Sequence, residues 1–392
     1  MTDVHHHALL VVLFVAAIAP LFTELPVRLR LPLVVLELLF GVAVGPQVLD
    51  LVSSEGTLKA LAALGLSFLF FLAGMDLDFG KLRGQPLRHG VTGWLLSISI
   101  ALALTLGLQR AGVVSDPVLV AVALSTTAIG TLLPILREAG ELDTALGRSI
   151  MGAGAIGEFG PIVLFSLIIT DQGVAVRSGL LVTFVFIALA CATIALRLQP
   201  PHVIALLSRT LQSTSQLPIR LSMLLLGGLV VLADVLGLDI LLGAFAAGSL
   251  VGLVSRGPGA EPFRQKLDAL GFGFLIPIFF VTSGAQLDLA ALMASPRSLA
   301  RVPLFLALFL IVRGAPVVLY RKELSAPERR SLALFSATTL PLVVVITAIG
   351  TATGRMLPEN AAALVGAGIL SVLLFPLIAL SLRAPSVAGK GA

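Results

Sequence analysis

Two ionisable residues stand in the middle of long apolar stretches of this 392-residue chain. Glu158 lies in GAGAIGEFGPIVLF, and Arg313 lies in LALFLIVRGAPVVLY. A charged side chain at the centre of a membrane-spanning helix costs about 2.5–3.5 kcal/mol on insertion scales, so its presence needs a reason. A carboxylate in a wet cavity can bind either a proton or a small cation, and one group with two exclusive occupants is the minimum for proton/cation exchange. We therefore predict that Glu158 binds a proton and a cation in turn.

Both residues also have purely structural interpretations. Glu158 could be paired permanently with Arg313, or it could cap a broken helix. The flanking Gly157, Gly160 and Pro161 loosen the backbone at this point and favour the ion-binding role. Arg313 stays protonated at physiological pH, so it cannot itself carry the proton. It either compensates the charge of a carboxylate or a helix end, or it snorkels to the nearer membrane interface.

Two hydroxyl-rich stretches form the second candidate group. Each stands early to middle in its apolar segment and precedes helix breakers, which are Gly130 and Pro134 in the first segment and Pro341 in the second. A broken helix exposes backbone carbonyls and amides that can hold an ion where they line a cavity. Hydroxyl oxygens would complete the shell around a partly dehydrated cation, unless they bond only to their own helices. The predicted cation-binding hydroxyls are those of Thr126, Thr127, Thr338 and Thr339.

Other acidic residues in or near apolar segments have weaker assignments. Glu37, Asp76 and Asp78 lie closer to the predicted membrane boundaries, where they would either shape an access funnel or be ordinary helix-end charges. Asp234 and Asp239 would mark a short turn between two spans.

The composition excludes several classes of protein. Hydrophobic residues make up 57% of the chain and charged residues 12%, against roughly a quarter charged in a soluble domain. The net charge of +5 comes from basic residues in short loops between apolar segments, so it does not indicate nucleic-acid binding. The single cysteine, Cys191, excludes an intramolecular disulfide and a cysteine-based metal site. Because the sequence has no HExxH, GxSxG or Walker A motif, we expect no enzyme, no cofactor and no metal centre.

Apolar runs between charged or Pro/Gly-rich breaks predict about thirteen transmembrane helices, so the expected fold class is an all-α polytopic membrane protein. The basic residues support this count, because 19 fall on one side of the predicted membrane and six on the other, alternating without exception. The bias predicts an N-terminus outside and a C-terminus in the cytoplasm of a bacterial-type plasma membrane. The predicted spans are 8–24, 31–49, 58–77, 90–109, 117–136, 147–170, 178–197, 219–236, 238–255, 269–287, 300–320, 329–351 and 360–382.

An internal repeat is visible at an offset near 210 residues. FFLAGMDLD, which ends at Asp78, resembles FFVTSGAQLD, which ends at Asp288; LSTTAIG at Leu124–Gly130 resembles FSATTLPL at Phe335–Leu342. An offset of seven spans reverses the orientation of equivalent helices, so the predicted repeat is inverted. Inverted repeats with ion sites at broken helices near the midplane are typical of secondary transporters.

These features together resemble the cation:proton antiporter-2 family, which includes sodium/proton exchangers and the Kef-type potassium/proton antiporters. The most specific stretch is VALSTTAIGTLLPILREAGELDTALGR, and the others are LELLFGVAVGP, LGLSFLFFLAGMDLD, DVLGLDILLGAFAAGSLVG and GFLIPIFFVTSGAQLDL. The resemblance implies an NhaA-like antiporter fold in which the fifth and twelfth spans cross with unwound middles. It also implies an essential carboxylate on the sixth span and a basic residue on the eleventh, which match Glu158 and Arg313.

The resemblance further implies a single transmembrane domain, 1–392, that assembles as a homodimer in the lipid bilayer and works by elevator-type alternating access. The dimerisation part would take roughly 1–85 and 215–290, the mobile core roughly 86–175 and 298–384, and a linker helix roughly 178–197.

The chain departs from the family pattern at the essential position. The family usually has aspartate there, preceded by Asn, Asp or Gln, whereas this chain has Gly157-Glu158, which leaves the choice of cation open. About ten residues follow the last predicted span, so we expect no nucleotide-binding regulatory domain. The predicted function is one-for-one exchange of protons for Na⁺ or K⁺. A channel-like cation leak and a non-transporting sensor or scaffold are the alternatives.

Overall fold

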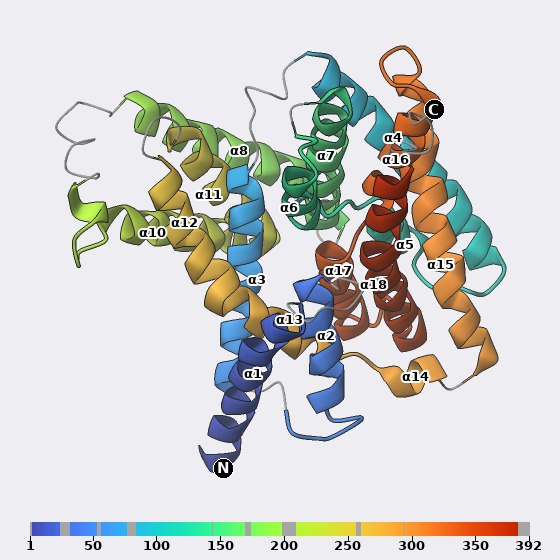
Figure 1. Ribbon diagram of the computed structural model, residues 1–392, viewed down its shortest axis with the longest axis horizontal. Coiled ribbons are helices and arrows are strands. Elements are labelled where there is room, and N and C mark those ends of the chain that lie inside the picture. The colour runs from blue at the N-terminus through green and yellow to red at the C-terminus, as the bar shows by residue number, and fades with distance from the viewer. Residues whose placement is uncertain are drawn as a thin grey trace, which may run out of the picture. The chain divides into compact units, whose positions relative to one another are not determined.

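The regular secondary structure of the described residues is entirely helical, which confirms the all-α class (Figure 1). The computed structural model describes residues 2–23, 32–52, 56–76, 84–142, 144–168, 174–197, 209–255, 260–293 and 295–382. The chain divides into two compact units, each built from two separate stretches of sequence. Unit 1 comprises Met1–Phe79 and Ile162–Leu287, and unit 2 comprises Gly80–Pro161 and Asp288–Ala392.

Eight helical segments in the described part are long and apolar enough to cross a membrane, so the chain is a multi-span membrane protein. The other five predicted spans contain apolar helical stretches of only 10–17 residues, so the count of thirteen stays a prediction. The predicted turn between the eighth and ninth spans is present. Helix α10 (Leu217–Val235) ends before it, and the Asp239 carboxylate caps α11 (Ile240–Val254) by accepting a hydrogen bond from the Leu241 N–H at 2.9 Å.

Unit 1 is held together by close helix packing. Helix α3 (Gly56–Asp76) packs along α11, and α2 (Leu33–Val44) packs along α13 (Ile276–Ala285). Gly248 lies so close to the Phe71 carbonyl that a Cβ would not fit, so its lack of a side chain permits this contact. The remaining helices of unit 1 are α1 (Thr2–Thr23), α8 (Val174–Arg197), α12 (Ala260–Leu270) and the π-turn η1 (Gly271–Leu275).

The peripheral acidic residues have different environments. Glu37 lies inside α2 and is only 2% exposed, so it is neither a helix-end charge nor solvated. Asp76, the last residue of α3, forms an ion pair with Arg264. Asp78 lies outside the described residues.

Unit 2 contains two broken helices. The first consists of α5 (Pro117–Leu124) and α6 (Ile129–Glu138), and the second of α16 (Ala326–Ala337) and α17 (Pro341–Ala352). Gly130 and Pro134 were expected to break the first helix, but both lie inside α6, and the backbone unwinds before them, at 125–128. Pro341 does begin α17, at a position where the missing N–H costs no helical hydrogen bond.

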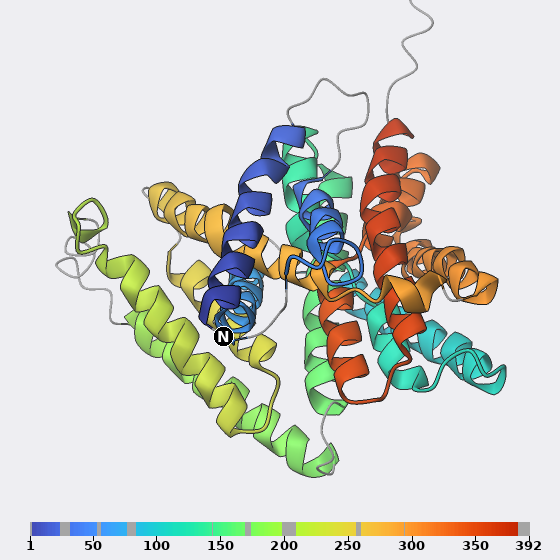
Figure 2. The same ribbon diagram turned by 90° about the horizontal axis from the view of Figure 1, so that it is seen from below.

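Long helices surround these breaks. Helix α7 (Ala145–Ile168) follows the first break and continues from unit 2 into unit 1 after Pro161. Helix α18 (Pro358–Ser381) follows the second break and packs against α17 (red in Figure 2). The other elements of unit 2 are α4 (Gln85–Arg110), α14 (Leu289–Met293), α15 (Pro296–Gly314) and the 3-10 turn η2 (Ala315–Tyr320).

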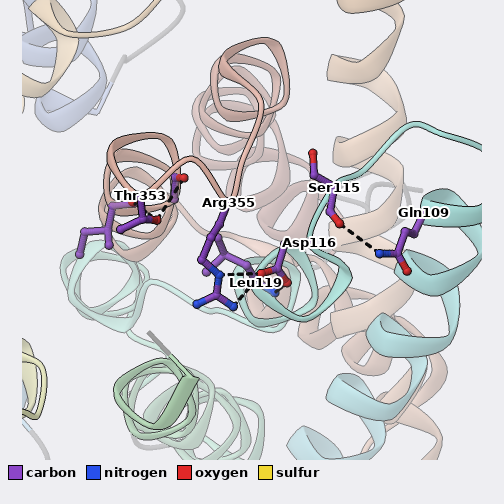
Figure 3. Close-up of polar contacts among 8 residues, drawn as sticks. Gln109, Ser115, Asp116, Leu119, Thr353 and Arg355 are labelled. Carbon is purple, nitrogen blue, oxygen red and sulfur yellow. Dashed lines mark hydrogen bonds and ion pairs between the residues drawn. The ribbon is translucent and has the colours of Figure 1, made fainter. Parts of the chain in front are cut away.

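An ion pair joins the two broken helices at ends that lie away from the breaks. Asp116 caps α5 through the Leu119 N–H, and its other carboxylate oxygen accepts hydrogen bonds from Nε and Nη2 of Arg355 at 2.7 and 2.6 Å (Figure 3). Arg355 belongs to the turn after α17, and Asn360 at the start of α18 donates to the Val113 carbonyl at 2.7 Å. The start of α5 is therefore fixed to the end of α17.

Candidate functional site

Glu158 lies within α7 and is buried, with 6% of its surface exposed. The backbone N–H of Ile129, the first residue of α6, hydrogen-bonds to the carboxylate. This places the carboxylate at the positive end of a half-helix. The second carboxylate oxygen, Oε2, is buried and has no hydrogen-bond partner among the described residues. One oxygen of Glu158 is thus held by the fold, and the other is available for a proton or a cation.

The local sequence explains how α7 meets the first break. Proline has no N–H, so Pro161 leaves the carbonyl four residues earlier, that of Gly157, without its helical donor. The Thr127 N–H donates to this carbonyl at 2.9 Å. The residue next to Glu158 is therefore bonded directly to the unwound segment. The pattern GEFGP predicts that the Gly157 carbonyl loses its helical donor. Only the structure shows that the Thr127 N–H replaces it.

Three of the four predicted threonines meet where the unwound segments cross. The hydroxyl groups of Thr126 and Thr339 lie 2.5 Å apart, and the Thr127 hydroxyl donates to the Ser336 carbonyl at 2.5 Å. The backbones are joined as well, because the Ala128 N–H donates to the Thr338 carbonyl at 2.9 Å. Each bond links the first broken helix to the second.

Thr338 uses its two polar groups differently. Its hydroxyl donates to the Leu334 carbonyl of its own helix at 3.0 Å, and its carbonyl accepts the hydrogen bond from the Ala128 N–H. Ser371 of α18, which the sequence did not indicate, forms hydrogen bonds to the backbone of the second break. Its hydroxyl accepts from the Thr339 N–H at 3.0 Å and lies 2.8 Å from the Thr339 carbonyl.

Arg313 binds neutral groups around the crossing and forms no ion pair with Glu158 within 4.0 Å. Its Nε donates to the Thr127 hydroxyl at 2.9 Å and lies 3.4 Å from the Ser336 carbonyl. Its Nη1 donates to Ser97 at 3.2 Å, and its Nη2 donates to the Ala153 carbonyl at 3.0 Å. The side chain is 3% exposed, so it does not snorkel to an interface. Hydroxyl and carbonyl oxygens from four different elements thus stabilise its positive charge.

Ser97 is a second residue that sequence reasoning missed, and a proline again explains its position. Pro316 deprives the Val312 carbonyl of its helical donor. The Ser97 hydroxyl donates to this carbonyl at 2.9 Å while it accepts from Arg313. A proline four residues after a mid-span carbonyl is thus the sequence signal that identifies both freed carbonyls, though not their new donors.

The site thus contains a buried carboxylate with one unpartnered oxygen. It lies next to the crossed helix breaks and the buried guanidinium of Arg313. The threonine hydroxyls and the freed carbonyls are oxygen ligands of the kind that monovalent cations accept. In a low-dielectric surrounding, a carboxylate binds a proton or a cation far more readily than it stays bare. The arrangement is suited to exchanging one positive ion for another.

Comparison with known proteins gives consistent similarities. The family model described as sodium/hydrogen exchanger, transmembrane, matches residues 11–380. The chain is 28% identical over 385 residues to YjbQ of Bacillus subtilis (strain 168), a provisionally named Na⁺/H⁺ antiporter, covering 94% of this chain and 62% of that protein. It is 27% identical to the glutathione-regulated potassium-efflux system protein KefC of Escherichia coli, covering 95% and 60%. The chain thus spans about three fifths of the length of these two relatives.

A solved structure shares the fold. The sodium proton antiporter MjNhaP1 from Methanocaldococcus jannaschii, determined at pH 8, matches with a TM-score of 0.66 over 97% of this chain and 96% of that chain. The sequence identity is 16%, so the likeness concerns the fold alone.

Proposed function

The chain belongs to the sodium/hydrogen exchanger transmembrane family, and on this premise we propose that it is a secondary active antiporter that exchanges protons for Na⁺ or K⁺. The observation that carries the proposal is the buried Oε2 of Glu158, which has no hydrogen-bond partner among the described residues and so can accept a proton or a cation. In the proposed cycle Glu158 binds a proton on one face of the membrane and exchanges it for the cation on the other. The proton concentration gradient drives the exchange, because one-for-one exchange moves no net charge and takes no energy from the membrane potential.

The cation is proposed to bind between the Glu158 carboxylate and the helix crossing. The Thr126, Thr127 and Thr339 hydroxyls retain lone pairs that could face a cation, because each hydroxyl has two. Thr338 would contribute its carbonyl rather than its hydroxyl, since the hydroxyl bonds to Leu334. Arg313 keeps a permanent positive charge nearby, so the single carboxylate supports one-for-one, electroneutral exchange.

The two units suggest a division of labour for elevator-type alternating access. Unit 2 contains Glu158, both breaks and Arg313, and we assign it the role of the mobile core. Unit 1 then supplies the dimerisation part, and α8 within it is the linker helix. The predicted plasma-membrane location and homodimer belong to this same proposal.

The deciding experiment is a pH-gradient dissipation assay in liposomes with the wild type, Glu158→Gln and Glu261→Gln. Glu158→Gln removes the titratable group without changing its size, so we expect a folded protein without exchange activity. Glu261 is an exposed residue of α12, and its variant is the matched control that should keep full activity. Na⁺, K⁺ and Li⁺ are added in turn, with and without a voltage clamp.

Each outcome has a clear meaning. Dissipation by one cation that disappears in Glu158→Gln identifies the substrate, and insensitivity to the clamp shows electroneutral exchange. Full activity of Glu158→Gln contradicts the carboxylate mechanism. Cation conductance without proton coupling would instead identify a channel-like leak. No movement of any of the three cations by folded protein would contradict the proposal and favour a different substrate or a non-transporting role.

A further inference from the structure

A small cavity lies beside Arg313 in unit 2, on the side where α4 and η2 approach the guanidinium. Trp94, Tyr320 and His89 line it together with Arg313. Trp94 is the only tryptophan of the chain and Tyr320 the only tyrosine. In membrane proteins these residue types gather at the water interfaces. Here the only residue of each type lines one cavity.

The polar atoms of both aromatic residues are buried without partners. Neither Trp94 Nε1 nor the Tyr320 hydroxyl has a hydrogen bond among the described residues, and Tyr320 is 2% exposed. A buried donor without an acceptor costs about 1–3 kcal/mol. Indole can only donate, and a phenol hydroxyl donates readily. Two residues with unpartnered donors line one cavity, which points to an occupant that accepts hydrogen bonds.

Arg313 adds a positive charge and further donors to the same cavity. All four acceptors that it contacts are neutral, and no carboxylate lies within 4.0 Å of it in the described part of the chain. Its Nη1 and Nη2 each carry two N–H groups and each makes one hydrogen bond, so one N–H of each remains for an occupant. A buried charge without a counter-charge is costly, and a bound anion would supply one.

His89, which lines the cavity, is in contact with Tyr320 and Glu323. The His89 ring packs edge-on against Tyr320, with centroids 5.0 Å apart, and its Nδ1 lies 3.3 Å from Oε2 of Glu323. The His89 and Glu323 side chains are 20% and 28% exposed, so both are partly accessible from the surface of unit 2.

We propose that this cavity binds a small monovalent anion of the halide class, held by Arg313, Trp94 and Tyr320. The uncompensated guanidinium favours an anion over a water molecule, because water is neutral and would leave the buried charge without a counter-charge. If Glu158 exchanges protons for cations as proposed above, the anion would neutralise Arg313 while Glu158 carries its ion.

Because Trp94 is the only tryptophan, its fluorescence reports on the cavity without background. The purified full chain is titrated with sodium bromide against sodium gluconate at constant ionic strength, and the titration is repeated with chloride present. We expect saturable quenching by bromide that chloride competes away. Tyr320→Phe keeps the ring but removes one donor, and should weaken bromide binding about tenfold. Thr92→Ala removes an exposed hydroxyl from the same helix, α4, and should leave binding unchanged.

Non-saturable quenching that the neutral quencher acrylamide reproduces would overturn the proposal and leave a water-filled cavity. An unchanged bromide affinity in folded Tyr320→Phe would overturn it as well. Arg313→Gln provides a second variant, in which the saturable component should disappear. The readout is binding and not transport, so saturable bromide binding by the wild type would stand even if the antiporter proposal fails.

Discussion

At the scale of single residues, the site depends on a glycine, Gly157, next to Glu158. Gly157 lies so close to Arg313 Nη2 and to the Thr127 hydroxyl that a Cβ would displace both groups. The guanidinium thus occupies the space that a side chain would fill at the position before the carboxylate. This contact requires glycine at the position before Glu158.

Gly157→Ala should therefore destabilise the protein by about 1–3 kcal/mol, as overpacked core substitutions do. It should also abolish exchange, because Arg313 would lose its bond to Thr127. Gly130→Ala is the matched control, since its Cβ would meet nothing within 4 Å and alanine favours a helix. Thermal unfolding midpoints of the two variants in detergent should move in opposite directions. Equal midpoints would show that Arg313 adapts to the extra methyl group.

At the scale of elements, each break replaces helical hydrogen bonds with bonds to other helices. The Thr127 and Ala128 N–H groups both donate to residues of other helices. Buried backbone groups in a membrane must find such partners. The breaks therefore have defined geometry, and the site they form is preorganised.

Thr127→Val tests this interpretation, because valine has nearly the same shape but neither of the two hydrogen bonds of the Thr127 hydroxyl, to Ser336 and from Arg313. We expect at least a tenfold rise in the KM for the cation, since each lost buried bond is worth about 1 kcal/mol or more. Thr338→Val loses only a bond within its own helix, so its effect should be clearly smaller. The measurement is cation-dependent pH dissipation in liposomes. A larger effect of Thr338→Val would mean that its hydroxyl binds the cation directly.

The Asp116–Arg355 ion pair is the other connection between broken helices (Figure 3). Asparagine at 116 still caps α5, so Asp116→Asn removes the ion pair and keeps the cap. A double-mutant cycle with Arg355→Gln should give a coupling energy of about 1 kcal/mol, which is modest because both side chains are partly exposed. Unfolding midpoints of the four proteins measure it. Additive effects of the two single substitutions would show that the pair does not fix α5 to α17.

At the scale of the whole molecule, the open question is how the helices are oriented in the membrane. The basic residues predict that the loop after α4 is outside and the loop after η2 is cytoplasmic. Arg110 and Lys322 are exposed residues in these two places. Since Cys191 is the only cysteine, Cys191→Ser gives a background without thiols.

On this background we expect Arg110→Cys to react with a membrane-impermeant maleimide from outside, and Lys322→Cys only after the cytoplasmic face is exposed. Right-side-out and inside-out vesicles give the comparison. Labelling of both positions from the same face would show that the number of spans between them is wrong. Retained exchange activity in each variant is the control for folding.

The sequence by itself determined the membrane class, the positions of the apolar helices and the family, because these follow from hydropathy, charge bias and local motifs. It also singled out Glu158, the threonines and Arg313 as unusual polar residues within apolar segments. Their roles as ligands stay predictions.

Only the tertiary structure decided which groups meet. The bonds between Thr126 and Thr339, and between Arg313, Thr127 and Ser97, join residues far apart in the chain. Sequence patterns describe local preferences, and a hydroxyl that bonds its own helix looks the same in sequence as one that crosses to another. The cavity at Trp94 and Tyr320 was hidden for the same reason, since a void is defined by the packing of several helices and not by any one of them.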